Sequence, residues 1–343
     1  MTGTGTKLPV VQAPMAGVQG SALAMAVSNA GGLGSLPCAV LGVEDMRREL
    51  AAIRAGTDRP FNVNFFCHAA PEIDSAQEAA WRKRLGPYYQ EFALDVPDAG
   101  VGPGRAAFDA ATVEALAPFA PPVVSFHFGL PAAELLARVK GWGATVVSSA
   151  TTVDEAVWLE RHGADVIVAQ GLEAGGHRGM FRTEDVTTQI GTLALVPQIV
   201  AAVRVPVWAA GGIASAAAVR AALALGAAAV QVGTAYLLAP EATTSSVHRA
   251  ALAGPGARHT ALTNLFTGRP ARSIVNRVMR ELGPLRGDVP AFPRAAGAMA
   301  PLRSRAEAQG RDDFSPLWAG QSAAACRSLP AADITLALAA GIR

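Results

Sequence analysis

Short apolar runs alternate along the chain with longer segments rich in Ala, Leu, Glu and Arg. A short run of Val, Ile, Ala or Phe bounded by Gly or Pro is typical of a strand buried on both faces, and the longer segments are typical of helices. Because strands that alternate with helices pair in parallel, the pattern predicts an α/β fold. The predicted strands are Leu8–Pro14, Leu33–Pro37, Phe61–Phe66, Val123–Phe128, Thr145–Ser149, Asp165–Gln170, Val205–Ala210 and Ala229–Tyr236.

Local signals support the helices between these strands. The predicted helix Asp154–His162 follows Thr151 and Thr152, and the predicted helix Ala216–Leu225 follows Ser215. Hydroxyl side chains are favourable N-caps because they accept a hydrogen bond from a free N–H group of the first turn.

A weak internal repeat supports the alternation of strands and helices. Gly-Ala pairs at residues 143–144, 163–164 and 226–227 each lie between a predicted helix and the next strand, as helix C-cap glycines do. Eight strand–helix units are the number found in a (β/α)8 TIM barrel, which we therefore predict, with an open doubly wound sheet as the alternative. No GxGxxG follows a strand and no GxxxxGK[ST] occurs, so the Rossmann and P-loop alternatives lose their main support.

Two stretches interrupt the alternation. Residues 67–122 are about twice as long as a usual connection and include Pro97–Gly104, a predicted surface excursion. Beyond residue 254 the chain becomes rich in Arg, Ala and Pro. The sequence thus predicts a barrel over residues 1–253, with the insertion 67–122 after the third strand, and a C-terminal helical cap over residues 254–343 packed on the barrel.

Composition narrows the class of function. Hydrophobic residues make up 51% of the chain and charged residues 16%, which is enough for a large core. The net charge of +2 includes no block of one sign, and aromatic residues make up 6%, which argues against nucleic acid or an acidic membrane as a partner. The three cysteines form no CxxC pair, so we expect no disulfide and no metal, and a reducing cytoplasm.

The sequence also argues against a membrane segment. The first residues lack a basic region that leads into an apolar one, so no signal peptide is predicted. The most apolar window, Ala221–Leu238, is interrupted by Gly226, Gln231, Gly233 and Thr234 and divides into a helix end and a strand.

Two glycine motifs predict a phosphate site. The seventh strand runs into Gly211 and Gly212, and the eighth contains Gln231, Gly233 and Thr234. In TIM barrels phosphate is commonly bound after these two strands, where backbone N–H groups are free to donate. A tight strand-to-helix turn is the structural alternative for either motif alone.

The loop Gln170–Gly179 carries the main candidate for catalysis. It follows the sixth predicted strand and contains four glycines and one imidazole, His177. An imidazole titrates near neutral pH, so we predict a catalytic role in proton transfer for His177. His68 and His127 lie at the ends of the third and fourth strands and are placed to face the same site, whereas the position of Glu173 relative to His177 is not predictable.

Polar and soft side chains at two other strands suit a flat, polar ring. Asn62 and Asn64 share one strand face, and buried amides need polar partners, either a flavin edge or a neighbouring loop. Met15, in Gln12–Gly17, suits packing against a ring or equally the core.

Together these motifs resemble those of the nitronate monooxygenases, formerly called 2-nitropropane dioxygenases, from the N-terminus to about residue 321. The matching segments are Gln12–Gly17, Asn62–His68, Gln170–Gly179, Ala209–Ile213, Gln231–Thr234 and Thr267–Arg272. The resemblance implies an FMN-containing TIM barrel without a metal. It implies oxidation of alkyl nitronates such as propionate 3-nitronate by O₂, to a carbonyl compound and nitrite, in a monomer or homodimer with a detoxifying role.

The same resemblance assigns the site residues. His177 would lie beside the substrate, as a base for a neutral nitroalkane or as a group that orients an anionic nitronate. The residues that would bind FMN are Met15, Asn64, Gln170, Gly175, Gly211, Gly212, Gln231, Val232, Gly233 and Thr234.

Other functions remain open on the sequence. An FMN-dependent NAD(P)H enoyl-thioester reductase, or an NAD(P)H:quinone-type reductase, would share the flavin motifs. A flavin-free phosphosugar isomerase would need only the two glycine motifs, and a binding scaffold would need none of them.

Overall fold

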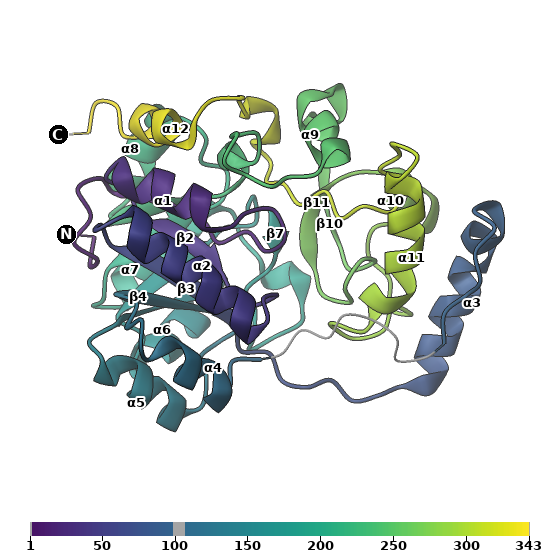
Figure 1. The fold of residues 1–343 in the computed structure, drawn as a ribbon, viewed down its shortest axis with the longest axis horizontal. Helices are drawn as coiled ribbons and strands as arrows, with labels where there is room; N and C mark the ends of the chain where they lie inside the picture. The colour runs from purple at the N-terminus through teal and green to yellow at the C-terminus, as the bar shows by residue number, and fades with distance from the viewer. Residues whose placement is uncertain (1, 99–106, 343) are drawn as a thin grey trace.

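The computed structural model describes residues 2–98 and 107–342, and it contains the predicted eight-stranded parallel barrel (Figure 1). The order in the sheet is β1-β9-β8-β6-β5-β4-β3-β2, and a parallel bridge between Val11 and Leu33 joins the two end strands. The TIM-barrel prediction is therefore confirmed. The strands are β1 Val10–Gln12, β2 Gly34–Pro37, β3 Phe61–Phe66, β4 Val123–His127, β5 Thr145–Ala150, β6 Val166–Gln170, β8 Val207–Ala210 and β9 Ala229–Val232.

The last strand is shorter than the sequence pattern predicts. Strand β9 ends at Val232, and after Gly233 the chain turns into a 3-10 helix, η2 (Thr234–Tyr236). Apolar residues continue through this turn because Ala235 and Tyr236 are buried in the core, so hydrophobicity alone could not mark the end of the strand.

Helices surround the barrel, and their ends follow the predicted signals. Thr152 caps α6 by accepting from the N–H of Glu155, and Ser215 caps α8 by accepting from the N–H of Ala218. The C-cap glycines at positions 143, 163 and 226 have φ of +86°, +101° and +95°, values that favour glycine. The helices of this layer are α1 Ser21–Asn29, α2 Val43–Gly56, α4 Ala110–Leu116, α5 Ala133–Gly141, α6 Val153–Arg161, α7 Thr192–Ala202 and α8 Ala216–Ala224.

The insertion and the C-terminal tail lie together beside the barrel (Figure 1). Helix α3 (Ser75–Glu91) of the insertion packs on α11 (Ala295–Glu307) of the tail, and Trp81 and Tyr89 share a hydrophobic cluster with Met299. The segment Pro97–Gly104 lies mostly outside the described residues. Helix α9 (Ser246–Ala253) comes directly before the tail, which also contains β10 Thr260–Thr263, β11 Ala271–Ile274, α10 Arg277–Leu282 and α12 Ala331–Leu338.

The tail contains strands as well as the helices expected of it. Strands β10, β11 and β7 (Gly176–His177) form an antiparallel sheet, so the tail pairs directly with the predicted catalytic loop. Helix α12 packs on α1 at the barrel wall, where Tyr236 and Thr335 share a hydrogen bond of 2.9 Å. In the described parts of the chain, no helix is both long enough and apolar enough to cross a membrane.

Candidate active site

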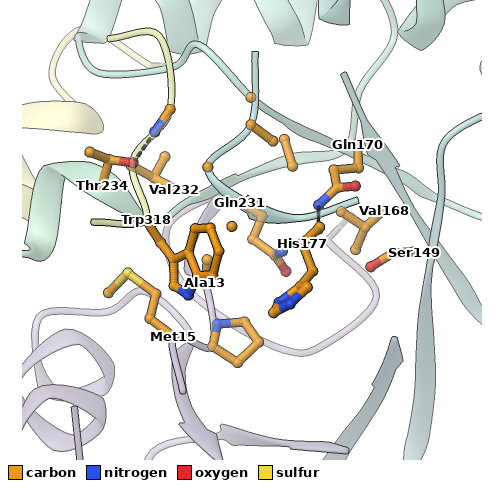
Figure 2. Close-up of a pocket in the computed structure, with 18 of the residues that line it drawn as sticks. Ala13, Met15, Ser149, Val168, Gln170, His177, Gln231, Val232, Thr234 and Trp318 are labelled. Carbon is orange, nitrogen blue, oxygen red and sulfur yellow. Dashed lines mark hydrogen bonds between the residues drawn. The ribbon is translucent and has the colours of Figure 1, made fainter. Parts of the chain in front are cut away.

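A cavity opens at the carboxyl ends of the barrel strands, where TIM barrels place their sites. All the residues that the sequence proposes for catalysis and cofactor binding line this one cavity (Figure 2). They are His177, Met15, Asn64, Gln170, Gly175, Gly211, Gly212, Gln231, Val232, Gly233 and Thr234. The fold thus brings together residues spread over more than 200 positions of the sequence.

The main chain and ring of His177 are held by the tail segment Thr267–Arg272. In the β7–β11 pairing His177 lies opposite Ala271, and the N–H of Arg178 donates to the carbonyl of Pro270 at 2.9 Å. The Nε2 atom of His177 lies 2.9 Å from the hydroxyl of Thr267. A residue from the tail therefore sets the orientation of the imidazole.

Two barrel residues hold the carbonyl of His177. Gln170 donates to it at 3.0 Å, and the Nε2 atom of His127 lies 3.1 Å away (Figure 2 shows the Gln170 bond). The other end of the Gln170 amide accepts from the N–H of Gly179 at 2.8 Å. The loop is thus tied to the ends of β6 and β4 at both sides of the catalytic candidate.

The protonation of His127 follows from its contacts. Its Nε2 atom faces a carbonyl, which can only accept, so Nε2 carries the proton. Its Nδ1 atom then accepts from the hydroxyl of Ser149, 3.1 Å away. Burial lowers the pKa of His127 to about 4, with smaller contributions from the cations Arg269 and Arg178, so the ring is neutral at pH 7.

Arg178 is a fully buried cation next to His177. Its guanidinium donates to the carbonyls of Gly171 and Gln170 at 2.7 and 2.6 Å and to the amide of Gln189 at 2.9 Å. Burial lowers its pKa to about 9, which still leaves it charged at neutral pH. Arg178 therefore holds the carbonyls at the end of β6 and at the start of its loop.

Aromatic side chains surround the imidazole of His177. Ring centroids lie 5.3 Å away for Trp318, 5.4 Å for Phe292, 6.1 Å for Phe128 and 6.4 Å for Phe66. Figure 2 shows the rings of Trp318 and His177 projecting into the cavity. No sequence signal links these four aromatic residues, because they come from four separate parts of the chain.

The other end of the cavity is built from glycines and closed by the tail. Gly211 and Gly212 have φ of +115° and +71°, which favours glycine at both positions. The hydroxyl of Thr234 accepts from the N–H of Gly320 at 3.0 Å, and the hydroxyl of Ser322 donates to the carbonyl of Gly212 at 2.7 Å. The tail segment 318–322 therefore touches both predicted phosphate motifs.

The two asparagines of β3 have different environments. Asn64 lines the cavity and donates to the hydroxyl and carbonyl of Ser125 at 3.0 and 3.2 Å. Asn62 lies deeper in the barrel, outside the lining, and donates to the hydroxyl of Ser35 at 3.0 Å. The shared strand face is as predicted, but only the residue nearer the strand end reaches the cavity.

The remaining candidates have structural contacts. Glu173 accepts from the N–H and the hydroxyl of Thr192, both at 2.8 Å, and so stabilises the start of α7. His68 is buried against Phe292, with 4.9 Å between ring centroids, and lies outside the cavity lining. Within the described residues no cluster of His, Cys, Asp and Glu could hold a metal ion.

The geometry agrees with what comparisons with known proteins show. Residues 1–340 match the profile of the family described as "Nitronate monooxygenase". The chain belongs to the nitronate monooxygenase family. It is 44% identical over 342 residues to a nitronate monooxygenase of Pseudomonas aeruginosa, covering 99% of this chain and 97% of that protein.

Solved structures agree with the family assignment. A nitroalkane oxidase from Streptomyces ansochromogenes superposes with a TM-score of 0.91 at 41% identity, over 99% of this chain and 96% of that one. FabK from Thermotoga maritima has a TM-score of 0.72 at 26% identity, over 98% and 93%. This member of the nitronate monooxygenase family is therefore an oxidoreductase on a TIM barrel, as the sequence predicts.

Proposed function

We propose that this chain binds FMN in the cavity and uses it to oxidise alkyl nitronates with O₂ to the carbonyl compound and nitrite. The observation that carries the proposal is the position of His177, at one end of a cavity whose other end is a glycine cradle. The family and the nitroalkane oxidase with the same fold supply the reaction class.

The cradle suits the phosphate of FMN. The first N–H groups of η2, at Thr234 and Ala235, have no partner within that helix and line the cavity with Gly212. Backbone donors of this kind bind phosphate oxygens. We assign the phosphate to Gly211, Gly212, Gly233 and Thr234.

The opposite end suits the flavin ring. Met15 offers a soft surface, and Asn64, Gln170 and Gln231 offer amides to the polar edge of the ring. Gly176 has φ of +70°, and a Cβ there would meet no atom of the described chain within 4 Å, so the loop leaves open space beside it. We assign Gly175 and Val232 to the wall between the two ends.

The bound flavin would supply the capacity to accept electrons from the nitronate carbon and pass them to O₂. The protein supplies position and hydrogen bonds. His177, oriented by Thr267, would donate a hydrogen bond to an anionic nitronate or accept the α-proton of a neutral nitroalkane. Overall, nitronate, O₂ and water balance against the carbonyl compound, nitrite and hydrogen peroxide, with two electrons moved from carbon to O₂.

The test is a visible spectrum of the purified chain, followed by O₂ uptake and nitrite release with ethyl nitronate and propionate 3-nitronate. We expect flavin absorbance and one nitrite per carbonyl product. Rapid anaerobic bleaching by NADH without nitronate turnover would instead indicate a reductase. A colourless protein that FMN cannot reconstitute would indicate flavin-free chemistry. The cytoplasmic location and the monomer or homodimer state stay predictions.

A further inference from the structure

The cavity wall near His177 is uncharged. Among the described residues that line the cavity, none has a Lys, Arg, Asp or Glu side chain. Its polar groups are amides, hydroxyls, imidazoles, the indole N–H of Trp318 and backbone, and we assign most of these to the flavin. The space left beside His177 is bounded by Phe66 and Trp318, which both line the cavity.

These two side chains belong to a larger aromatic wall. Phe66 packs on Phe128 and Phe292, with centroids 5.0 and 6.4 Å away, and Phe128 and Phe292 are 5.6 Å apart. Trp318 is supported from behind by Phe266, at 5.5 Å. The rings of this wall present no charged group to the substrate.

A cation lies behind the wall. The guanidinium of Arg269 stacks on the ring of Phe128, 4.0 Å from its centroid, and donates to the carbonyl of Met180. Arg269 is not among the residues that line the cavity. This charge is therefore not part of the cavity wall.

From this wall we propose that the site selects nitronates with an uncharged apolar substituent, such as butyl nitronate, over those with a second anionic group, such as propionate 3-nitronate. The inference rests on the proposed function. An apolar chain gains from burial against the rings, whereas a carboxylate would lose water without gaining a cation.

The first experiment uses the FMN-loaded chain and measures kcat/KM by O₂ uptake for ethyl, propyl, butyl and pentyl nitronates and propionate 3-nitronate. Burying one methylene is worth about fourfold in affinity, so we expect kcat/KM to rise by about that factor per carbon until the space is filled. Propionate 3-nitronate should fall at least about tenfold below butyl nitronate. A flat alkyl series, or a preference for propionate 3-nitronate, overturns the selectivity while the proposed function stands; no turnover of any nitronate overturns both.

Two substitutions at one position test the cause. Trp318→Lys places an ammonium group in the wall, and Trp318→Gln is the matched polar control without charge. We expect the ratio of kcat/KM for propionate 3-nitronate to that for butyl nitronate to rise by about tenfold in the Lys variant relative to the Gln variant. Equal ratios in the two variants would contradict the proposal.

Arg269→Met tests whether the charge of Arg269 reaches the substrate. If the wild-type chain prefers propionate 3-nitronate and this variant loses the preference, Arg269 reaches the substrate and the proposal is wrong. If the wild-type chain prefers butyl nitronate and the variant keeps that preference, the wall acts as proposed. The FMN content and melting temperature of each variant are measured alongside, so that loss of folding is not mistaken for a change of selectivity.

Discussion

His177 is fixed at its carbonyl as well as at its ring. The carbonyl accepts from Gln170 and His127, and the imidazole contacts the hydroxyl of Thr267. Because both the backbone and the ring of His177 are held, the residue loses little conformational freedom when the substrate binds. This favours a reaction that depends on the orientation of the imidazole. At the residue scale, this arrangement leads to two predictions.

The first prediction concerns the role of the imidazole. His177→Asn should keep the yellow flavin colour, because the other cavity residues stay in place, but should lower kcat for neutral nitroethane by about 10²- to 10⁴-fold. The loss for ethyl nitronate should be smaller, because that substrate has already lost its proton. Steady-state O₂ uptake with both substrates checks this, and His162→Asn on an exposed helix end is the control. Equal activity of His177→Asn and wild type on both substrates would remove His177 from the mechanism.

The second prediction concerns stability against pH. Burial lowers the pKa of both His127 and His248 to about 4, whereas unfolded histidines titrate near 6.5. Between these two pH values the unfolded chain binds more protons than the folded chain. The two histidines therefore do not lower the free energy of unfolding above pH 6.5, but they lower it progressively as the pH falls toward 4.

Replacing one of these histidines measures its contribution to the pH dependence of the unfolding free energy. His127→Gln keeps an N–H donor for the carbonyl of His177 but cannot titrate, so the pH dependence should weaken by about one proton. Denaturant unfolding at several values between pH 7 and 4.5 measures this, with the exposed His162→Gln as control. An unchanged slope for His127→Gln would show that His127 is not neutral in the folded protein.

At the scale of elements, the barrel and the tail build the site together. Strand β11 pairs with the His177 loop, and the segment 318–322 contacts Thr234 and Gly212 at the other end of the cavity. The close approach at Gly175 shows how tight this contact is, because a Cβ there would lie 2.5 Å from the backbone N of Gly320. Cofactor binding should therefore depend on how the tail is seated.

Gly175→Ala tests this dependence. The added methyl should displace the segment at Gly320 and raise the Kd for FMN by about tenfold or more, since a contact of this length involves backbone that cannot rotate away. Gly42→Ala is the matched control, because a Cβ at Gly42 meets nothing within 4 Å. Quenching of FMN fluorescence on titration with apoprotein gives both values. Equal affinities would show that the tail takes no part in the flavin site.

Contacts between distant elements leave no local signal in the sequence. Strands, caps and glycine motifs were predictable because they depend on neighbours along the chain, as the caps at Thr152 and Ser215 show. Bonds such as Ser322 to Gly212 join residues 110 positions apart through one hydroxyl and one carbonyl. No periodicity in the sequence predicts such a contact. The sequence therefore predicts the tail as a cap, but it does not predict that the tail contacts the glycine motifs of the cavity.

For the whole molecule, the insertion and the tail are tied to each other and to the barrel. Arg277 of α10 pairs with Glu91 of α3 at 2.8 Å and with Asp313 at 3.3 Å. The same two elements share the cluster around Trp81, while β7–β11 and α12–α1 join the tail to the barrel. We propose on this basis that residues 254–343 cap the barrel and unfold with it.

Trp81→Ala tests the cap through its core. Trp81 is 1% exposed, and its indole N–H has no hydrogen-bond partner among the residues that the structure describes. The variant therefore loses packing alone, worth about 3–5 kcal/mol of unfolding free energy. Ile73→Ala, in the same insertion but 67% exposed, should change stability by less than about 0.5 kcal/mol. Denaturant unfolding is followed by tryptophan fluorescence and by flavin release. We expect the two signals to shift together in Trp81→Ala, because the elements that this cluster holds also complete the cavity; flavin release that stays at the wild-type midpoint would mean that the insertion and tail unfold apart from the barrel.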